Sequence, residues 1–160
     1  VIGGGFPMAG FGGKASAMDL LAPVGPVYQA GTLSGNPAAV AAGLTTLELL
    51  DAEAYAHLET LGAALQAGLE DALASSKQPG RVQRIGSMIT LYFNDGSPLH
   101  DFDDAKAADH QKFAKFFHGM LDRGFHLPPS GYESWFLSTA HSKADIDATV
   151  AAAADVMKTL

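Results

Sequence analysis

The glycine-rich first quarter of the chain is the feature that most constrains its fold. Residues 1–36 show little helical periodicity apart from one short helix expected at 16–22, and glycines recur at 3–5 and 12–13. Glycine at this density indicates backbone that turns tightly or lies close to another surface. Because this region has too few strands to close a core, we predict that residues 1–50 are not self-sufficient.

Helical patterning begins at Pro37. Asn36 is a suitable N-cap, and proline is tolerated at the first helical position because its missing N–H costs no hydrogen bond there. We therefore expect a helix to about Leu50. Asp51 is the next N-cap candidate, and leucines at three- and four-residue spacing predict a second helix to about Ala74.

The second half of the sequence predicts a small α/β module. Its expected elements are two strands, one helix and two short extended segments, at residues 81–85, 88–93, 103–122, 125–129 and 135–139. Ser142 and Asp145 form an S-x-x-D capping box before a last helix that continues to the C-terminus. The chain is thus expected to divide into residues 1–50 and residues 51–160.

Composition excludes several classes of function. Ten basic and 17 acidic residues give the 160-residue chain a net charge of −7, with no basic cluster, so no nucleic-acid partner is expected. No apolar run approaches the roughly 20 residues that span a bilayer, so no membrane partner is expected. The absence of cysteine excludes disulfides and a thiolate nucleophile and fits a reducing compartment, and we expect a cytoplasmic protein.

Common catalytic motifs fail in this sequence. Met8 and Ala15 stand where a Walker A loop needs Gly and Ser or Thr, and no strand pattern leads into the G-x-G at Gly10. The six histidines lack metal-ligand spacing on a predicted helix, so no metal site is expected. The chain itself offers no nucleophile–base pair.

Two segments resemble the class III (fold type I) aminotransferases, which use pyridoxal phosphate. They read V-I-G-G-G-F-P at 1–7 and G-P-V-Y-Q-A-G-T-L-S-G-N-P at 25–37. The second run, together with the stretch 131–141, is similar to the glutamate-1-semialdehyde 2,1-aminomutases of that family. The resemblance implies an α/β fold with an α+β C-terminal module: residues 1–50 would end the large pyridoxal-phosphate-binding domain, and residues 51–160 would form the small C-terminal domain.

In the resembled family, the lysine that binds the cofactor as a Schiff base directly precedes the residue matched by Val1. We therefore expect no catalytic residue in this chain, which alone would be inactive; Lys14 lies in the wrong part of the motif and is interpreted as a surface lysine. Two explanations stay open. Either the chain is the C-terminal piece of a longer enzyme, or the sequence is divided at a lysine that carries the cofactor; we favour the second.

The resemblance assigns cofactor binding to Gly31 and Thr32. A phosphate dianion needs N–H and O–H donors, and a Gly-Thr turn before a helix supplies both. In the resembled family this threonine reaches the phosphate of the neighbouring subunit, which implies a homodimer with shared active sites. Tyr28 is expected to face the substrate or to pack at that interface, whereas Asn36 is interpreted as a helix cap.

Glu133 is the most discriminating candidate for substrate binding. Many class III aminotransferases hold a substrate carboxylate with an arginine in this region, but residues 125–160 contain none. Glu133 matches a glutamate of the aminomutase pattern and would disfavour a second dicarboxylate substrate; the alternative is an exposed loop glutamate without a role.

The resemblance implies an aminomutase that converts a small amino-aldehyde, glutamate-1-semialdehyde, to 5-aminolevulinate, the tetrapyrrole precursor. The cofactor would be pyridoxal 5'-phosphate, with pyridoxamine 5'-phosphate in the cycle. Two alternatives stay open: a class III ω-aminotransferase, and a non-catalytic dimerisation module.

Overall fold

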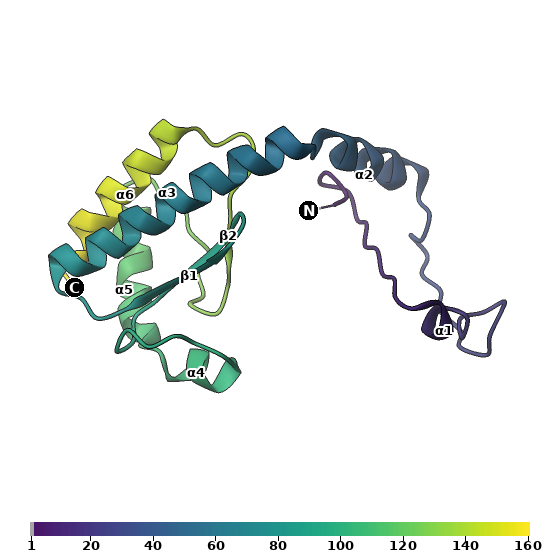
Figure 1. The fold of residues 1–160 in the computed structure, drawn as a ribbon, viewed down its shortest axis with the longest axis horizontal. Coiled ribbons are helices and arrows are strands. Elements are labelled where there is room, and N and C mark those ends of the chain that lie inside the picture. The colour runs from purple at the N-terminus through teal and green to yellow at the C-terminus, as the bar shows by residue number, and fades with distance from the viewer. Residues whose placement is uncertain (1) are drawn as a thin grey trace. The chain divides into compact units, whose positions relative to one another are not determined.

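The computed structural model describes residues 2–160 and divides the chain into two units. The first unit ends at Ala52, and the second unit is Glu53–Leu160. Each unit is described by itself, and Figure 1 shows their elements. In the described residues, no helix is both long and apolar enough to cross a membrane.

The first unit consists of loops and two helices, α1 (Ala15–Met18) and α2 (Pro37–Leu49). The expected N-cap of α2 is confirmed, because the Asn36 Oδ1 accepts hydrogen bonds from the N–H groups of Ala38 and Ala39 at 3.1 and 3.2 Å. The prediction of a helix over 16–22 is wrong in length, since α1 ends after one turn.

A glycine of α2 lets the first motif pack against this helix. A Cβ at Gly43 would overlap the Met8 sulfur and lie 3.1 Å from the carbonyl oxygen of Ile2. Both Gly43 and Ala39 are buried. Small side chains on α2 therefore hold residues 2–8 close to it.

The second unit packs helices against one face of an antiparallel sheet. The strands are β1 (Arg81–Ile85), β2 (Met88–Tyr92) and β3 (Trp135–Phe136), in the order β1-β2-β3. The helices are α3 (Ala52–Ser76), α4 (Phe102–Ala107), α5 (His110–Leu121) and α6 (Lys143–Met157). The mixture of helix and sheet agrees with the predicted α+β module.

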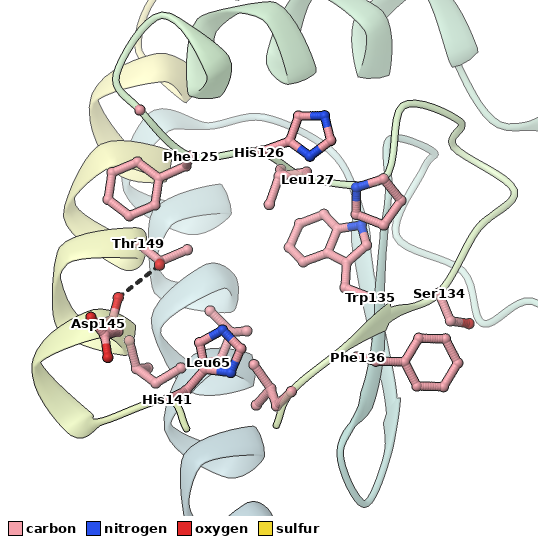
Figure 2. A pocket seen from close by; sticks show the side chains of 14 residues that line it. Leu65, Phe125, His126, Leu127, Ser134, Trp135, Phe136, His141, Asp145 and Thr149 are labelled. Carbon is pink, nitrogen blue, oxygen red and sulfur yellow. Dashed lines mark hydrogen bonds between the residues drawn. The ribbon is translucent and has the colours of Figure 1, made fainter. Parts of the chain in front are cut away.

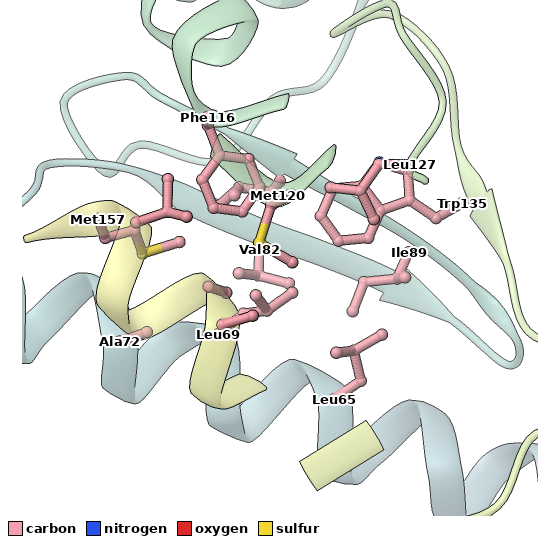
Figure 3. Packing of buried hydrophobic residues seen from close by; sticks show 14 of the residues in the cluster. Leu65, Leu69, Ala72, Val82, Ile89, Phe116, Met120, Leu127, Trp135 and Met157 are labelled. Carbon is pink, nitrogen blue, oxygen red and sulfur yellow. The ribbon is translucent and has the colours of Figure 1, made fainter. Parts of the chain in front are cut away.

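The core of the second unit lies between the sheet and helices α3, α5 and α6 (Figure 3). Leu69 of α3, Phe116 of α5 and Met157 of α6 are fully buried. They pack in one cluster with Val82 and Ile89 of the sheet. Alternation along the strands places these two residues on the covered face.

The predicted helix over 103–122 is wrong, because the structure contains two helices there. Ala108 is extended (ψ 156°) and Asp109 caps a new helix, with its carboxylate accepting from the Lys112 N–H at 2.8 Å. The Asp109 N–H donates to the carbonyl oxygen of Phe93 at 2.7 Å. This bond to the residue after β2 ties the start of α5 to the sheet.

The predicted extended segments are only partly confirmed, and the last helix ends at Met157 rather than at the C-terminus. Residues 125–129 form no strand, and of 135–139 only Trp135–Phe136 pairs with β2. The capping box of α6 is confirmed: Ser142 and Asp145 exchange the two expected bonds.

Candidate functional site

The segment that carries Gly31 and Thr32 forms two successive turns. The Ser34 N–H donates to the carbonyl oxygen of Gly31 at 3.0 Å, and the Asn36 N–H donates to that of Leu33 at 3.1 Å. A Cβ at Gly31 would lie 3.0 Å from the Ser34 hydroxyl, which is tighter than ordinary contact. Thr32 lies within the first turn and is exposed.

The donors of this turn fit an anionic phosphate. The N–H and hydroxyl of Thr32 have no hydrogen-bond partner among residues 2–160. The first N–H groups of α2 are less available, because Asn36 already accepts from Ala38 and Ala39. An anion held here would thus be held by the turn rather than by the helix N-terminus.

The structure brings the two glycine-rich motifs together in the first unit. Residues from the end of the first motif onward and from the second motif line a pocket of about 620 Å³. The lining residues from both motifs and from α2 are Pro7, Met8, Ala9, Phe11, Gln29, Gly31, Leu33, Ser34, Gly35, Asn36, Ala39 and Val40. Gly31 therefore contributes to this pocket, whereas Thr32 and Tyr28 do not line it.

Tyr28 and Lys14 are both exposed. The Tyr28 side chain is 83% exposed in the first unit. Lys14 directly precedes α1 and makes no capping hydrogen bond, which agrees with its interpretation as a surface lysine.

Glu133 lies in the second unit, in a tight turn before β3. Its N–H donates to the Ser130 carbonyl oxygen at 3.1 Å, and its Oε2 accepts from the Ser130 N–H at 3.2 Å. The side chain is exposed, and Oε1 has no partner among the described residues. One carboxylate oxygen is therefore free to meet a ligand.

A second pocket, of about 410 Å³, lies in the second unit beside this turn (Figure 2). Its wall includes Leu65, Trp135 and Asp145, but none of the predicted site residues. Hydrogen bonds from the Ser142 N–H and hydroxyl lower the pKa of Asp145, so its carboxylate serves the helix cap. Among the described residues, no group of three or more His, Asp or Glu could hold a metal ion.

Sequence reasoning missed the residues that support the Glu133 turn. The Tyr132 ring stacks on the His110 imidazole and contacts the Phe102 ring. The predicted helix over 103–122 includes His110 in its interior and gives it no role. Asp109 was the available signal, because aspartate favours N-caps and would have marked a helix start before His110.

The comparisons with known proteins agree with the sequence resemblance. The chain is 52% identical over 154 residues to a glutamate-1-semialdehyde 2,1-aminomutase from Thermus thermophilus, a match that covers 95% of this chain and 36% of the relative. The chain thus spans only about a third of that relative's length.

Solved structures of related enzymes share the fold. A β-phenylalanine aminotransferase from Variovorax paradoxus is 32% identical with a TM-score of 0.84, covering 96% of this chain and 36% of that one. A glutamate-1-semialdehyde aminomutase from Pseudomonas aeruginosa is 26% identical with a TM-score of 0.69, covering 79% and 28%, and a variant of it was solved in complex with PMP. These likenesses confirm the predicted fold class.

The family assignment rests on nearly the whole chain. The model of the aminotransferase class-III family matches residues 1–154, which include both glycine-rich motifs and the Glu133 turn. The chain therefore belongs to the class III aminotransferase family.

Proposed function

We propose that this chain is part of a pyridoxal-phosphate-dependent aminomutase that converts glutamate-1-semialdehyde to 5-aminolevulinate. The identity of 52% to an aminomutase supports the reaction. The proposed cofactor site rests on one observation: Thr32 is exposed, and its N–H and hydroxyl have no hydrogen-bond partner within residues 2–160. Because cysteine is absent, we also place the protein in the cytoplasm.

Gly31 and Thr32 would hold the cofactor phosphate. The Thr32 hydroxyl and N–H would donate to phosphate oxygens, and Gly31 keeps the turn tight enough to present both. When bound, pyridoxal phosphate supplies the electron sink for moving an amino group between neighbouring carbons. The lysine that binds it is expected immediately before Val1, outside the described residues.

Glu133 and Tyr28 would act on the substrate side. A carboxylate at Glu133 repels a second negative charge, so a dicarboxylate that could remove the amino group would bind weakly. Tyr28 would border the substrate or the subunit interface with its exposed ring. In this proposal the chain contributes selectivity between substrates, and the lysine that bonds to the cofactor lies outside the described residues.

We also propose a homodimer in which Thr32 reaches the partner's cofactor. Val27, Tyr28 and Leu33, which flank Thr32, are 48, 83 and 53% exposed. Apolar side chains clustered beside polar donors mark surfaces that another chain covers. A dimer would bury them and bring Thr32 to a second subunit.

A class III ω-aminotransferase is the second candidate. The TM-score of 0.83 to an omega-transaminase from Sphaerobacter thermophilus favours it, whereas the higher identity to an aminomutase favours the first. Residues 125–160 contain no arginine to hold the carboxylate of an external amino donor. Product analysis of the full-length protein with glutamate-1-semialdehyde separates the two.

The test uses the full-length protein that contains this chain. Intact mass under denaturing conditions should increase by one cofactor after borohydride reduction, and the protein should form 5-aminolevulinate without an external amino acceptor. Thr32→Ala removes a hydrogen bond to a charged group, worth about 1.5–3 kcal/mol, and should weaken cofactor binding by roughly 10- to 150-fold. Thr32→Ser keeps the hydroxyl and should retain the cofactor.

Three results would contradict these proposals in different ways. Unchanged cofactor affinity in Thr32→Ala removes Thr32 from the site. Formation of product only with an external amino donor favours the ω-aminotransferase. A protein that takes up no cofactor but still dimerises favours the non-catalytic dimerisation module.

A further inference from the structure

The turn that carries Glu133 is held against two helices by an aromatic stack. The Tyr132 ring lies over the His110 imidazole, with centroids 4.1 Å apart and planes inclined by 23°. The Phe102 ring also contacts the Tyr132 ring, with centroids 5.7 Å apart. Since His110 begins α5 and Phe102 begins α4, one side chain joins the turn to both helices.

His110 is itself fixed in place. Its Nε2 lies 2.9 Å from the carbonyl oxygen of Ala105, so this nitrogen must carry a proton and donate it. The other edge of the ring faces the turn: a Cβ at Gly131 would lie 2.8 Å from the His110 Nδ1 and 3.2 Å from Cγ of Phe113. Glycine at 131 therefore lets the backbone of the turn lie directly on the imidazole.

The break between α4 and α5 fixes the position of His110 relative to the sheet. The Asp109 N–H donates to the carbonyl oxygen of Phe93 at 2.7 Å, at the end of β2. The Asp109 carboxylate caps the new helix at the Lys112 N–H. His110 follows directly, so its position is set by the sheet rather than by a continuous helix.

The hydrogen bonds of the turn close it but do not attach it to α4 or α5. They join Glu133 to Ser130 through two bonds, and the Tyr132 N–H to the Ser130 hydroxyl at 3.2 Å. After the turn, Trp135 is buried in β3. Directly after Glu133, the Thr90 hydroxyl of β2 donates to the Ser134 hydroxyl at 3.3 Å. Within residues 130–133, contact with the helices comes from the Tyr132 ring and the Gly131 backbone, so the direction of the Glu133 carboxylate depends on them.

We propose that Tyr132 and His110 are positioning residues that set where the Glu133 carboxylate faces the substrate. The inference rests on the proposed role of Glu133 in rejecting a second dicarboxylate. Without the stack, the turn can rotate about its connection to β3, and the carboxylate moves away from where the competing carboxylate would bind. The electrostatic penalty on that competitor then falls with distance. Tyr132 thus acts through Glu133 and touches no reacting atom.

The test compares Tyr132→Leu, Tyr132→Phe and Glu133→Gln in the full-length holoenzyme. The competing dicarboxylate is 2-oxoglutarate, which takes the amino group to become glutamate. Tyr132→Leu should raise the rate of this transfer relative to 5-aminolevulinate formation by roughly tenfold. Glu133→Gln should raise it at least as much, and Tyr132→Phe, which keeps the stacked ring, should match the wild type.

Two further measurements distinguish positioning from a general loss of structure. The double variant Tyr132→Leu/Glu133→Gln should transfer the amino group to 2-oxoglutarate no faster than Glu133→Gln alone. Both changes remove the same repulsion between the Glu133 carboxylate and 2-oxoglutarate, so their effects should not add. Amide hydrogen exchange over residues 130–134 should be roughly tenfold faster in Tyr132→Leu and unchanged in α3. If Tyr132→Leu does not fold, His110→Ala with His110→Phe as control provides the same comparison.

Each contrary outcome has a separate meaning. If Glu133→Gln leaves the transfer to 2-oxoglutarate unchanged, the proposed role of Glu133 is wrong and the positioning inference is overturned with it. If Glu133→Gln raises the transfer while Tyr132→Leu alters neither transfer nor exchange, the positioning inference alone is overturned. Additive effects in the double variant would also overturn it.

Discussion

The two units of the chain contrast in how they use apolar residues. In the second unit, Leu69, Phe116 and Met157 are fully buried in one cluster. In the first unit, the buried residues among those described are Gly3, Ala39 and Gly43, while Phe11 and Tyr28 are 66 and 83% exposed. The unit with the more specific motifs therefore has little core of its own.

Helices α2 and α3 show the same contrast, although both carry apolar residues at helical spacing. Val40, Leu44 and Leu47 lie on one face of α2 and are 45–56% exposed. Leu65 and Leu69, at the same kind of spacing on α3, are at most 2% exposed. Periodicity thus fixes which side chains share a face, but not whether the chain itself covers that face.

The largest effect is expected from separating the units. Residues 53–160 produced alone should unfold in one cooperative transition, because they contain the whole 20-residue core cluster. Residues 1–52 alone should show no cooperative transition in circular dichroism, since they bury almost no apolar side chain. A sharp melting transition of the 1–52 peptide would remove the contrast between the units.

Two matched leucines sharpen the comparison. Leu69→Ala should lower the free energy of unfolding by about 2–5 kcal/mol, because Leu69 is fully buried. Leu44→Ala removes the same atoms from a side chain that is 56% exposed. In this chain it should change the free energy of unfolding by less than about 0.5 kcal/mol.

Urea denaturation of both variants in the 160-residue chain and in the full-length protein is the measurement. In the full-length protein, the cost of Leu44→Ala should exceed about 1 kcal/mol if another part of that protein covers α2. Equal costs for Leu44→Ala in the two proteins would show that this face of α2 stays open.

Local signals in the sequence predicted local structure well. The caps at Asn36 and Ser142 were confirmed, because an N-cap is decided by residues within one turn of each other. The hairpin of β1 and β2 followed from β-branched residues around Gly86-Ser87 in the same way. These elements need no information from distant parts of the chain.

The errors come from contacts between distant residues. The helix over 103–122 divides where the Asp109 N–H bonds to Phe93; Asp109 itself is a recognisable cap, but its bond to the sheet cannot be predicted from a helical pattern. The Tyr132–His110 stack likewise joins two segments that the sequence gives no reason to pair. The family resemblance identified Gly31, Thr32 and Glu133 as candidate site residues, but it did not show which residues hold Glu133 in place.

A smaller effect is expected at the cap of α6. The Ser142 hydroxyl and the Asp145 carboxylate close a capping box, so Ser142→Ala should destabilise the second unit by about 1 kcal/mol. Ser142→Asp keeps a capping acceptor and serves as the control, although its charge lies beside Asp145. Urea midpoints of residues 53–160 provide the measurement, and equal midpoints for Ser142→Ala and the wild type would contradict the prediction.

The smallest effect, and the one most sensitive to pH, is expected at the link between β1 and α3. The Arg84 guanidinium bonds both carboxylate oxygens of Glu59, at 2.7 and 2.9 Å, and Arg84 is largely shielded while Glu59 is more than half exposed. This hydrogen bonding lowers the pKa of Glu59 below its ordinary value of 4.5. The pair therefore stabilises the folded state above that value and loses its contribution as the pH falls through the lowered pKa.

Glu59→Gln should accordingly lower the urea midpoint at pH 7, and its difference from the wild type should shrink as the pH falls through the lowered pKa of Glu59. Asp155→Asn is the control, because the Lys158–Asp155 pair is exposed on both sides and should contribute less. A difference between wild type and Glu59→Gln that stays constant on acidification would show that the Arg84 bond does not depend on the ionised carboxylate. Arg84 would then link β1 to α3 through neutral hydrogen bonds, including the one from its Nε to the Gln66 side chain at 2.9 Å.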